Sequence, residues 1–455
     1  MIKRIRLVAW TLVVSLGFTA MAQAESLVDT LTSAYNNSGL LEQNRALLRA
    51  ADEDLAQAVA STLPVIGWAY NVSNTRTSGG GADLIQESVR LSGSLILYDG
   101  GSNRLAVEAQ KETILGTRQA LRSIEQDVLL RAVEAYMNVR RDGEFVTLRQ
   151  NNVRLITEEY RAAQDRFEVG EVTRTDVALA EARLAAARSL LAAAEGTRER
   201  SIEEFRAAVG RAPNAPNQVS PAPVSRGIAD AKAFAVRNHP AILEVQHAVS
   251  AAELNIRRAQ AALEPTVRLQ GSLSTNRDSE ESRQIGLEAS GPIYSGGRLS
   301  SQVRQFMSRR DATRSGLHVT TIGIEQRVGN AYSFLLVARA SRQASDQQIS
   351  AARVAFEGVR EEAKLGARTT LDVLNAEQEL LDAQANSISA QAEEVIASYS
   401  VLAAMGLLNV EHLGLPVQQY DPSAYYNLAK DAPTAISPQG QALDRVLRAI
   451  GEAQR

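Results

Sequence analysis

The amino-acid sequence predicts a mainly α-helical fold with a few membrane β-strands, built as tandem-duplicated helix–hairpin–helix–helix units. Prolines are absent from residues 65–212 and 293–415, so uninterrupted helices of unusual length are allowed there. Four short segments alternate aliphatic residues with smaller or polar ones, the period-two pattern of strands with one apolar face. The same motifs return at a constant spacing, which indicates an internal duplication.

Residues 1–24 have the pattern of a secretory signal peptide. Three cations precede an apolar run, and Ala22-Gln23-Ala24 provides a small-residue cleavage site. Cleavage removes three positive charges and no negative one, which takes the formal net charge from −3 to −6. This mildly acidic balance argues against a nucleic-acid partner. The chain has no cysteine, so we expect neither disulfides nor a lipid-bearing N-terminal cysteine.

The duplication divides the mature chain into a first repeat, residues 25–220, a second repeat, residues 221–416, and a tail, residues 417–455. The segments that end at Pro64 and Pro265 match at an offset of 201. Further along, the offset is 196, as shown by Tyr98 and Tyr294, Ala135-Tyr136 and Ala331-Tyr332, Gly170 and Gly366, and Asp176-Val177 and Asp372-Val373. The first copy therefore has five more residues between the strands.

Each copy is expected to contain three helices. In chain order they cover residues 27–63, 103–169 and 172–209, and then 228–263, 298–365 and 369–405. At 1.5 Å per residue, each middle helix would reach about 100 Å. Gly210 and Gly406 are placed to end the last helices, and aliphatic residues recur every seven positions from Leu374 to Leu402, the period of supercoiled packing. The helices alone leave an ordinary soluble coiled coil as an alternative.

The alternating segments favour a membrane protein instead. They lie within residues 66–72, 89–97, 267–273 and 285–293, and polar stretches at 74–83 and 274–284 are expected to form the loops at the hairpin tips. After the signal, no apolar run approaches the ~18–20 residues of a membrane-spanning helix, so a crossing would use strands. Four strands cannot close a barrel, and open sheet edges are not tolerated in lipid. Several copies must share one barrel, and three would give twelve strands.

Taken together, duplicated and behind a signal peptide, these motifs resemble the TolC family of outer-membrane channel-tunnels. The resemblance covers the chain up to about residue 416 and rests on the LYDGG and IYSGG motifs and the paired turns VGEVTRTDV and LGARTTLDV. It implies a homotrimeric α-barrel tunnel across the periplasm, topped by a 12-stranded β-barrel, four strands per protomer, in outer-membrane lipid of a Gram-negative bacterium. It also implies two partners, a periplasmic adaptor protein and an inner-membrane ABC exporter or proton-driven pump.

The LYDGG and IYSGG motifs mark where each strand pair returns to the periplasm and a long helix begins. Gly100, Gly101, Gly296 and Gly297 would supply the freedom in φ that this change of direction needs. A run of three glycines at 79–81 is expected to be a flexible hairpin tip, since no Lys-Ser/Thr follows it as in a phosphate-binding loop.

The paired turns should form the periplasmic tip, where the sequence suggests a gate. Asp176 and Asp372 occupy matching positions, and Asp372 would contribute to an acidic ring that favours cations if it faces the lumen. We expect Arg368 to hydrogen-bond Asp176 and Thr175 of a neighbouring helix pair and so to hold the tip closed. In the family, links between these positions hold the closed tip.

Two observations limit this hypothesis. The family's tip tyrosine is here Ala363 and its second tip aspartate is Asn375, so the gate would be weaker or differently built and the acidic ring smaller. In addition, Thr173 with Asp176 and Thr369 with Asp372 fit the capping box that starts a helix. The aspartates can act as caps alone or in both roles.

The same turns would receive the adaptor. By resemblance, Gly170, Thr173, Gly366 and Thr369 shape the exposed tips to which the coiled-coil hairpin of an adaptor docks. The alternative is a simple tight turn between helices, which both glycines would serve in any case.

The tail after residue 416 contains prolines and polar residues. Residues 442–450 form one short amphipathic stretch. We expect the tail to wrap the waist of the tunnel or to be partly disordered.

The sequence offers little support for catalysis, a cofactor or a metal. The histidines are scattered, and His239 and His247 lack a third metal ligand. We therefore expect a passive exit duct rather than an enzyme, serving type I protein secretion, because the lipid-attachment cysteine is missing and the second tip reads LGARTTLDVLNAEQELL. Multidrug efflux is the alternative within this class, and a periplasmic coiled-coil scaffold is the alternative outside it.

Overall fold

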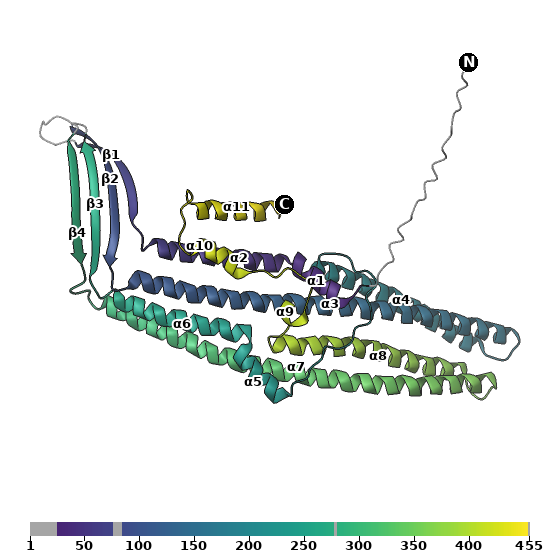
Figure 1. Ribbon diagram of the computed structural model, residues 1–455. Coiled ribbons are helices and arrows are strands. Elements are labelled where there is room, and N and C mark those ends of the chain that lie inside the picture. The colour runs from purple at the N-terminus through teal and green to yellow at the C-terminus, as the bar shows by residue number, and fades with distance from the viewer. Residues whose placement is uncertain (1–24, 76–83, 277–279, 454–455) are drawn as a thin grey trace, which may run out of the picture.

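The structure is a computed structural model that describes residues 25–75, 84–276 and 280–453 (Figure 1). The predicted signal peptide, the glycine run at 79–81 and most of the predicted loop at 74–83 lie outside these ranges. The molecule is elongated, with a four-stranded sheet at one end and two helical hairpin turns at the other. No helix within the described ranges combines the length and the apolar character needed to cross a membrane.

Two very long helices form the frame of the molecule. They are α3 (Ser102–Glu168) and α7 (Arg298–Lys364), each 67 residues long, and they return through α4 (Arg174–Val209) and α8 (Thr370–Ala404). The predicted bounds of all four are confirmed to within about two residues. In the half of the molecule that ends at the hairpin turns, the helices lie in the order α4-α3-α8-α7 (Figure 1).

The prediction of one continuous first helix in each copy is wrong, because the helix is interrupted in both copies. The structure has two helices in each place: α1 (Leu27–Asn37) with α2 (Gly39–Ala60), and α5 (Ile228–Asn238) with α6 (Pro240–Ala261). Ser38 is extended, with ψ at 107°, and its hydroxyl accepts a hydrogen bond from the Leu41 N–H at 3.2 Å. His239 is extended because it precedes a proline, whose ring excludes the helical conformation from the preceding residue.

The strands form one antiparallel sheet in the order β1-β2-β3-β4. Their bounds are β1 Val65–Thr75, β2 Leu84–Tyr98, β3 Thr266–Asn276 and β4 Glu281–Ser290. The register places Trp68 beside Leu91 and Leu91 beside Leu273. The predicted loop at 274–284 is too long, because β3 continues to Asn276 and β4 starts at Glu281.

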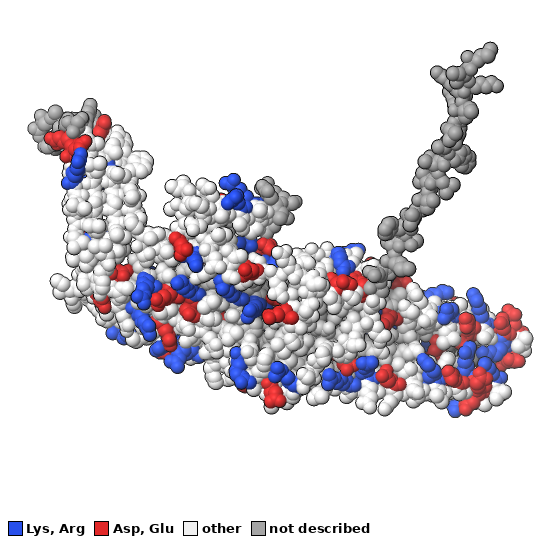
Figure 2. Space-filling model, viewed as in Figure 1, with Lys and Arg blue, Asp and Glu red and all other residues white. Residues whose placement is uncertain are grey.

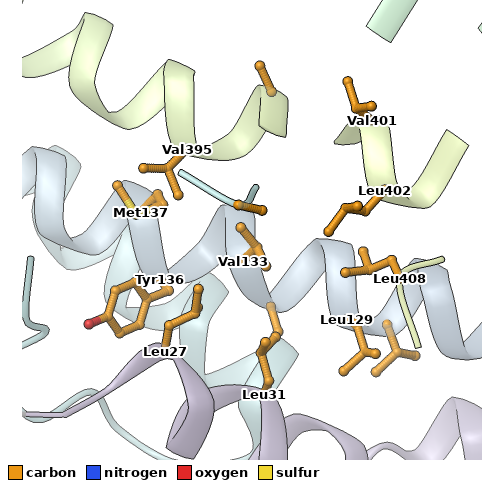
Figure 3. Close-up of a cluster of buried hydrophobic side chains, with 14 of the residues drawn as sticks. Leu27, Leu31, Leu129, Val133, Tyr136, Met137, Val395, Val401, Leu402 and Leu408 are labelled. Carbon is orange, nitrogen blue, oxygen red and sulfur yellow. The ribbon is translucent and has the colours of Figure 1, made fainter. Parts of the chain in front are cut away.

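The main core lies at the waist, between the sheet and the hairpin turns. We call its members the waist cluster; they include Leu27, Leu31, Leu129, Val133, Tyr136, Met137, Val395, Val401, Leu402 and Leu408 (Figure 3). Tyr136 is fully buried, and its hydroxyl lies 2.8 Å from the carbonyl oxygen of Glu25 and 3.0 Å from that of Asn217. The duplicated Tyr332 donates its hydroxyl proton to the Arg226 carbonyl at 2.8 Å.

A short helix, α9 (Val410–Leu413), precedes the tail, and the described part of the tail contains α10 (Pro422–Ala429) and α11 (Pro438–Ala453). α10 packs on α2, where the Tyr425 hydroxyl donates to the Glu53 carboxylate at 2.7 Å. The Arg118 guanidinium of α3 lies 5.1 Å from the ring of Tyr426. The predicted amphipathic stretch falls within α11, whereas α10 was not predicted.

Candidate functional site

The sheet has one apolar face and one polar face. The apolar face combines residues that the register aligns across the four strands: Ile66, Trp68, Tyr70, Val72, Val89, Leu91, Leu95, Leu269, Leu273, Ile285 and Leu287. Many of these side chains are solvent-exposed, with Trp68 at 77% and Ile285 at 82%. Such a large exposed apolar surface is typical of contact with lipid or protein.

The opposite face of the sheet is polar and borders a hollow of about 630 Å³. Its lining includes Arg90, Ser92, Arg268, Gln270, Gln284 and Glu288. The visible surface of the strand layer carries few charges until its outer end, whereas positive and negative side chains crowd the hairpin turns (Figure 2). One end of the molecule is therefore built for an apolar environment and the other for water.

Both layers of the molecule end in free edges. In the described part of the chain, β1 pairs only with β2, and β4 only with β3. The helical layer repeats this arrangement, because α4 packs on α3 at one side and α7 packs on α8 at the other. An unpaired strand edge presents a row of free N–H and C=O groups to any further strand.

The strand-to-helix turns use their glycines in left-handed conformations. Gly100 and Gly101 have φ of 65° and 82°, and Gly296 and Gly297 have φ of 59° and 79°. In the first turn the Asp99 carboxylate accepts hydrogen bonds from the N–H groups of Gly101 at 2.9 Å and Asn103 at 2.8 Å. These turns fix the direction in which each long helix leaves the sheet.

The hairpin turns close their helices with the same hydrogen bonds in both copies. Gly170 and Gly366 have φ of 83° and 78°. The N–H of each glycine bonds to the carbonyl three residues earlier, and the N–H of the following residue bonds to the carbonyl five residues earlier. These paired bonds form the Schellman motif, which satisfies the last carbonyls of a helix. An added Cβ at either glycine would meet open space, so only the positive φ requires glycine there.

Both tip aspartates take part in complete capping boxes. Asp176 Oδ2 accepts bonds from the backbone N–H and the hydroxyl of Thr173 at 2.9 and 2.7 Å, and Asp372 Oδ2 does the same with Thr369 at 3.0 and 2.8 Å. The hydroxyl and amide of Thr173 lower the pKa of Asp176, and the amide and hydroxyl of Thr369 lower that of Asp372. Both groups stay ionised at the tip, and the alternative role as helix caps is present in the structure.

The proposed gate residues are not all brought together within one chain. Arg368 Nε donates to Glu362 Oε2 of its own hairpin at 2.8 Å, and both side chains are about half exposed. Thr175 is exposed at the first turn. At Asn375, one of the two positions that depart from the family pattern, the side-chain oxygen Oδ1 accepts a hydrogen bond from the Arg183 guanidinium of α4 at 3.3 Å. The link from Arg368 to the aspartate of a neighbouring hairpin stays a prediction.

Sequence reasoning missed a buried polar contact between the two hairpins. Glu377 of α8 is 4% exposed and accepts a hydrogen bond from Asn152 of α3 at 2.8 Å, while its second oxygen is buried without a hydrogen-bond partner in the described chain. Burial, reinforced by the Glu159 carboxylate, raises the pKa of Glu377 to about 7. Arg360 of α7 lies 3.6 Å from Glu159. The heptad pattern on α8 places Glu377 beside core positions, and this feature of the sequence could have indicated that the carboxyl is buried.

The two histidines considered as metal ligands have structural roles. His239 Nδ1 accepts the Ala241 N–H at 3.1 Å, and burial lowers the pKa of this imidazole to about 4. His247 Nδ1 lies 2.8 Å from Glu112 Oε2 and ties α6 to α3. No group of three or more His, Cys, Asp or Glu residues in the described ranges could hold a metal ion.

Comparison with known proteins gives a family match over most of the chain. The sequence profile described as outer membrane efflux protein matches residues 30–211 and 234–407. The outer membrane efflux protein BepC of Brucella suis is 36% identical over 427 residues, which cover 90% of this chain and 91% of BepC. The alkaline protease secretion protein AprF of Pseudomonas aeruginosa is 25% identical over 371 residues, 75% of this chain and 76% of AprF.

Solved structures agree with the fold. The CmeC outer membrane channel of Campylobacter jejuni superposes with a TM-score of 0.75 at 17% identity and covers 90% of both chains. A crystal structure of CusC superposes with a TM-score of 0.75 at 18% identity, over 83% of this chain and 91% of that one.

Proposed function

Because the chain belongs to the outer membrane efflux protein family, we propose that three copies form the exit duct of a tripartite export system. The chain lies in the outer membrane of a Gram-negative bacterium and has a long periplasmic tunnel. Its family and fold are those of channels, not of enzymes. In the assembled duct the strands would cross the outer membrane and the long helices would enclose the periplasmic passage.

The observation that carries this proposal is the pair of free edges in both layers. If β4 of one copy pairs with β1 of the next, α7 of the first copy meets α4 of the next, so one rotation closes both layers. Three copies supply twelve strands, and a closed ring leaves no edge exposed to lipid. The apolar face would then meet the bilayer and the polar hollow would face the lumen.

This assembly is tested by purifying the protein from outer membranes in detergent. We expect a mass of three chains by light scattering and discrete single-channel currents in a planar bilayer. A monomeric protein, or one that never inserts into lipid, would refute the duct. A scaffold of the coiled-coil class would instead be recovered from the soluble periplasmic fraction.

We further propose that the tip is held closed by Arg368. Its Nε is bonded to Glu362, and its terminal nitrogens are available to reach Asp176 and Thr175 of an adjacent hairpin. Arg368→Ala should therefore raise single-channel conductance in a planar bilayer. Lys364→Ala is the matched control, because Lys364 forms a similarly exposed ion pair with Glu361 on the same turn. Unchanged conductance in Arg368→Ala, or an equal rise in both variants, would eliminate the gate.

The tip turns are also the proposed docking site of the periplasmic adaptor, which would couple the duct to an inner-membrane ABC exporter or proton-driven pump. Thr173 and Thr369 are exposed there, beside Gly170 and Gly366. Support comes from the exposure of these turns at the far end of the long helices and from membership in the outer membrane efflux protein family.

Type I protein secretion is the proposed use of the duct, and multidrug efflux is the second candidate. The names of AprF and of the proteases secretion protein PrtF of Dickeya chrysanthemi favour the first, while BepC, at 36% identity, favours the second. Deleting the gene separates them. Loss of a protein from the culture supernatant with unchanged drug susceptibility would support secretion, and the reverse result would support efflux.

A further inference from the structure

The last helix of the chain, α11, presents an apolar stripe that its own chain covers only in part. Leu443 is buried against Tyr425 and Ala429 of α10. On the same side of the helix, Val446 is 37% exposed and Leu447 is 45% exposed. Charged residues, among them Arg445 and Asp444, occupy the rest of the surface. An amphipathic helix of this kind is completed by an apolar partner surface.

α11 is held at one edge of the molecule. In the half of the molecule that lies next to the sheet, the helices pack in the order α2-α3-α6-α7. The edge helices of that half are therefore α2 and α7. α10 is fastened to α2 through Tyr425 and Glu53, and α11 packs on α10. Figure 1 shows α11 beyond α2, on the side away from α6 and α7, and running alongside the long helices. A helix lying in a membrane surface would run across them instead.

The opposite edge, formed by α7, carries exposed aliphatic side chains at about the same position along the long axis of the molecule as α11. α10 is docked at Arg118 of α3, whose η nitrogen donates to the Pro422 carbonyl at 3.4 Å. The 196-residue repeat aligns Arg118 with Arg314 of α7. Slightly further along α7, Val319 is 69% exposed and Ile322 is 51% exposed, and their spacing of three residues puts them on one face.

We propose that α11 packs across the joint between two copies of this chain, placing Val446 and Leu447 on Val319 and Ile322 of the neighbouring copy. This inference rests on the trimer proposed above, because only ring closure brings the α2 edge of one copy to the α7 edge of the next. The occupant is a second copy because both surfaces lie on the edges that the closed ring joins. The tail is then an inter-subunit clamp at the waist of the duct.

Disulfide cross-linking tests the clamp directly, because the chain has no native cysteine. Leu447→Cys is combined with Val319→Cys in one protein and with Ile322→Cys in another, and each is oxidised as the full-length protein in outer membranes. We expect denaturing gels without reductant to show species of two and three chain masses, which reductant converts to one. Arg445→Cys with Ile322→Cys is the control, since Arg445 lies on the other side of α11, and it should give at least fivefold less product.

The outcomes separate the clamp from the trimer. A native trimer that yields no product from either pair, or only a link within one chain, would overturn the clamp and leave the duct standing. A protein that is monomeric before oxidation would overturn both.

A charge placed on the stripe gives an independent readout. Leu447→Asp should lower the temperature at which trimers dissociate by at least about 3 °C relative to Arg445→Asp, which introduces the same residue on the polar side. Equal dissociation temperatures for the two variants would contradict the clamp.

Discussion

The waist and the hairpin tips of this molecule are stabilised in opposite ways. At the waist, Leu129, Val133 and Tyr136 are fully buried in one continuous apolar cluster (Figure 3). Towards the tips the apolar cluster shrinks to Ile156, Leu184 and Ala187, and the surface becomes dense in charge (Figure 2). Apolar burial is hard to undo in water, whereas exposed ion pairs contribute little and exchange readily. We therefore expect the waist to be the rigid part of the molecule and the tips to be the part that separates more easily.

The largest expected effect is at the waist. Tyr136→Ala removes a fully buried ring and should destabilise the protein by about 3–5 kcal/mol. The measurement is trimer yield and dissociation temperature. Tyr136→Phe keeps the ring and loses only the hydroxyl bonds to backbone carbonyls, so it should cost about 1–2 kcal/mol. A Tyr136→Ala trimer as heat-resistant as the parent would break the distinction between waist and tips.

The next effect concerns the buried contact near the tips. The pKa of Glu377 is raised from 4.5 to about 7, so the folded protein binds a proton more tightly than the unfolded chain. Stability should therefore fall as pH rises from about 4.5 to 7, and the cost persists above that window. Glu377→Gln removes the charge and should be more stable than the parent by on the order of 1–3 kcal/mol at pH 8, with no difference at pH 4.

This effect is measured as the dissociation temperature of both proteins across that pH range. The titration is shaped by the groups that face Glu377, which are Glu159, Arg360 and Arg183. Glu357→Gln, at an exposed site on α7, is the control that should not alter the pH profile. A constant difference between Glu377→Gln and the parent from pH 4 to pH 8 would show that the buried carboxyl does not titrate there.

The smallest effect is at the outermost turn. Thr173→Ala deletes the hydroxyl that accepts the Asp176 N–H at 3.3 Å and should weaken the start of α4 by about 1 kcal/mol. Hydrogen exchange in the first turn of α4 should become about fivefold faster. Thr175→Ala, an exposed position in the same turn, should leave the exchange rate unchanged. Equal acceleration in both variants would mean that the cap is not what holds the turn.

Features determined by nearby residues could be predicted from the sequence. The capping boxes need only Thr173 with Asp176 and Thr369 with Asp372, three positions apart, and both are present. The proline-free stretches and the 196-residue repeat predicted the long helices closely. The break at His239 also had a local signal, the following Pro240, which outweighs the helical periodicity on either side.

Features that depend on distant residues could not be predicted in this way. Asn152 and Glu377 are 225 positions apart, and only the packing of α3 on α8 joins them. The docking of α10 depends on Tyr425 meeting Glu53 across 372 positions. Arg368 has Glu362 six residues away as a partner, and the sequence alone did not rank this contact against a neighbouring hairpin.

The turns at Gly170 and Gly366 satisfy their own backbone groups through bonds that stay within each hairpin. Among the described residues, the main-chain hydrogen bonds seen at these two turns have both partners in the same hairpin. Moving one tip away from its neighbours would therefore leave these main-chain hydrogen bonds intact, and the contacts that break would be those of side chains. The mouth of the passage would then widen by a movement of intact helical hairpins, without local unfolding of the backbone.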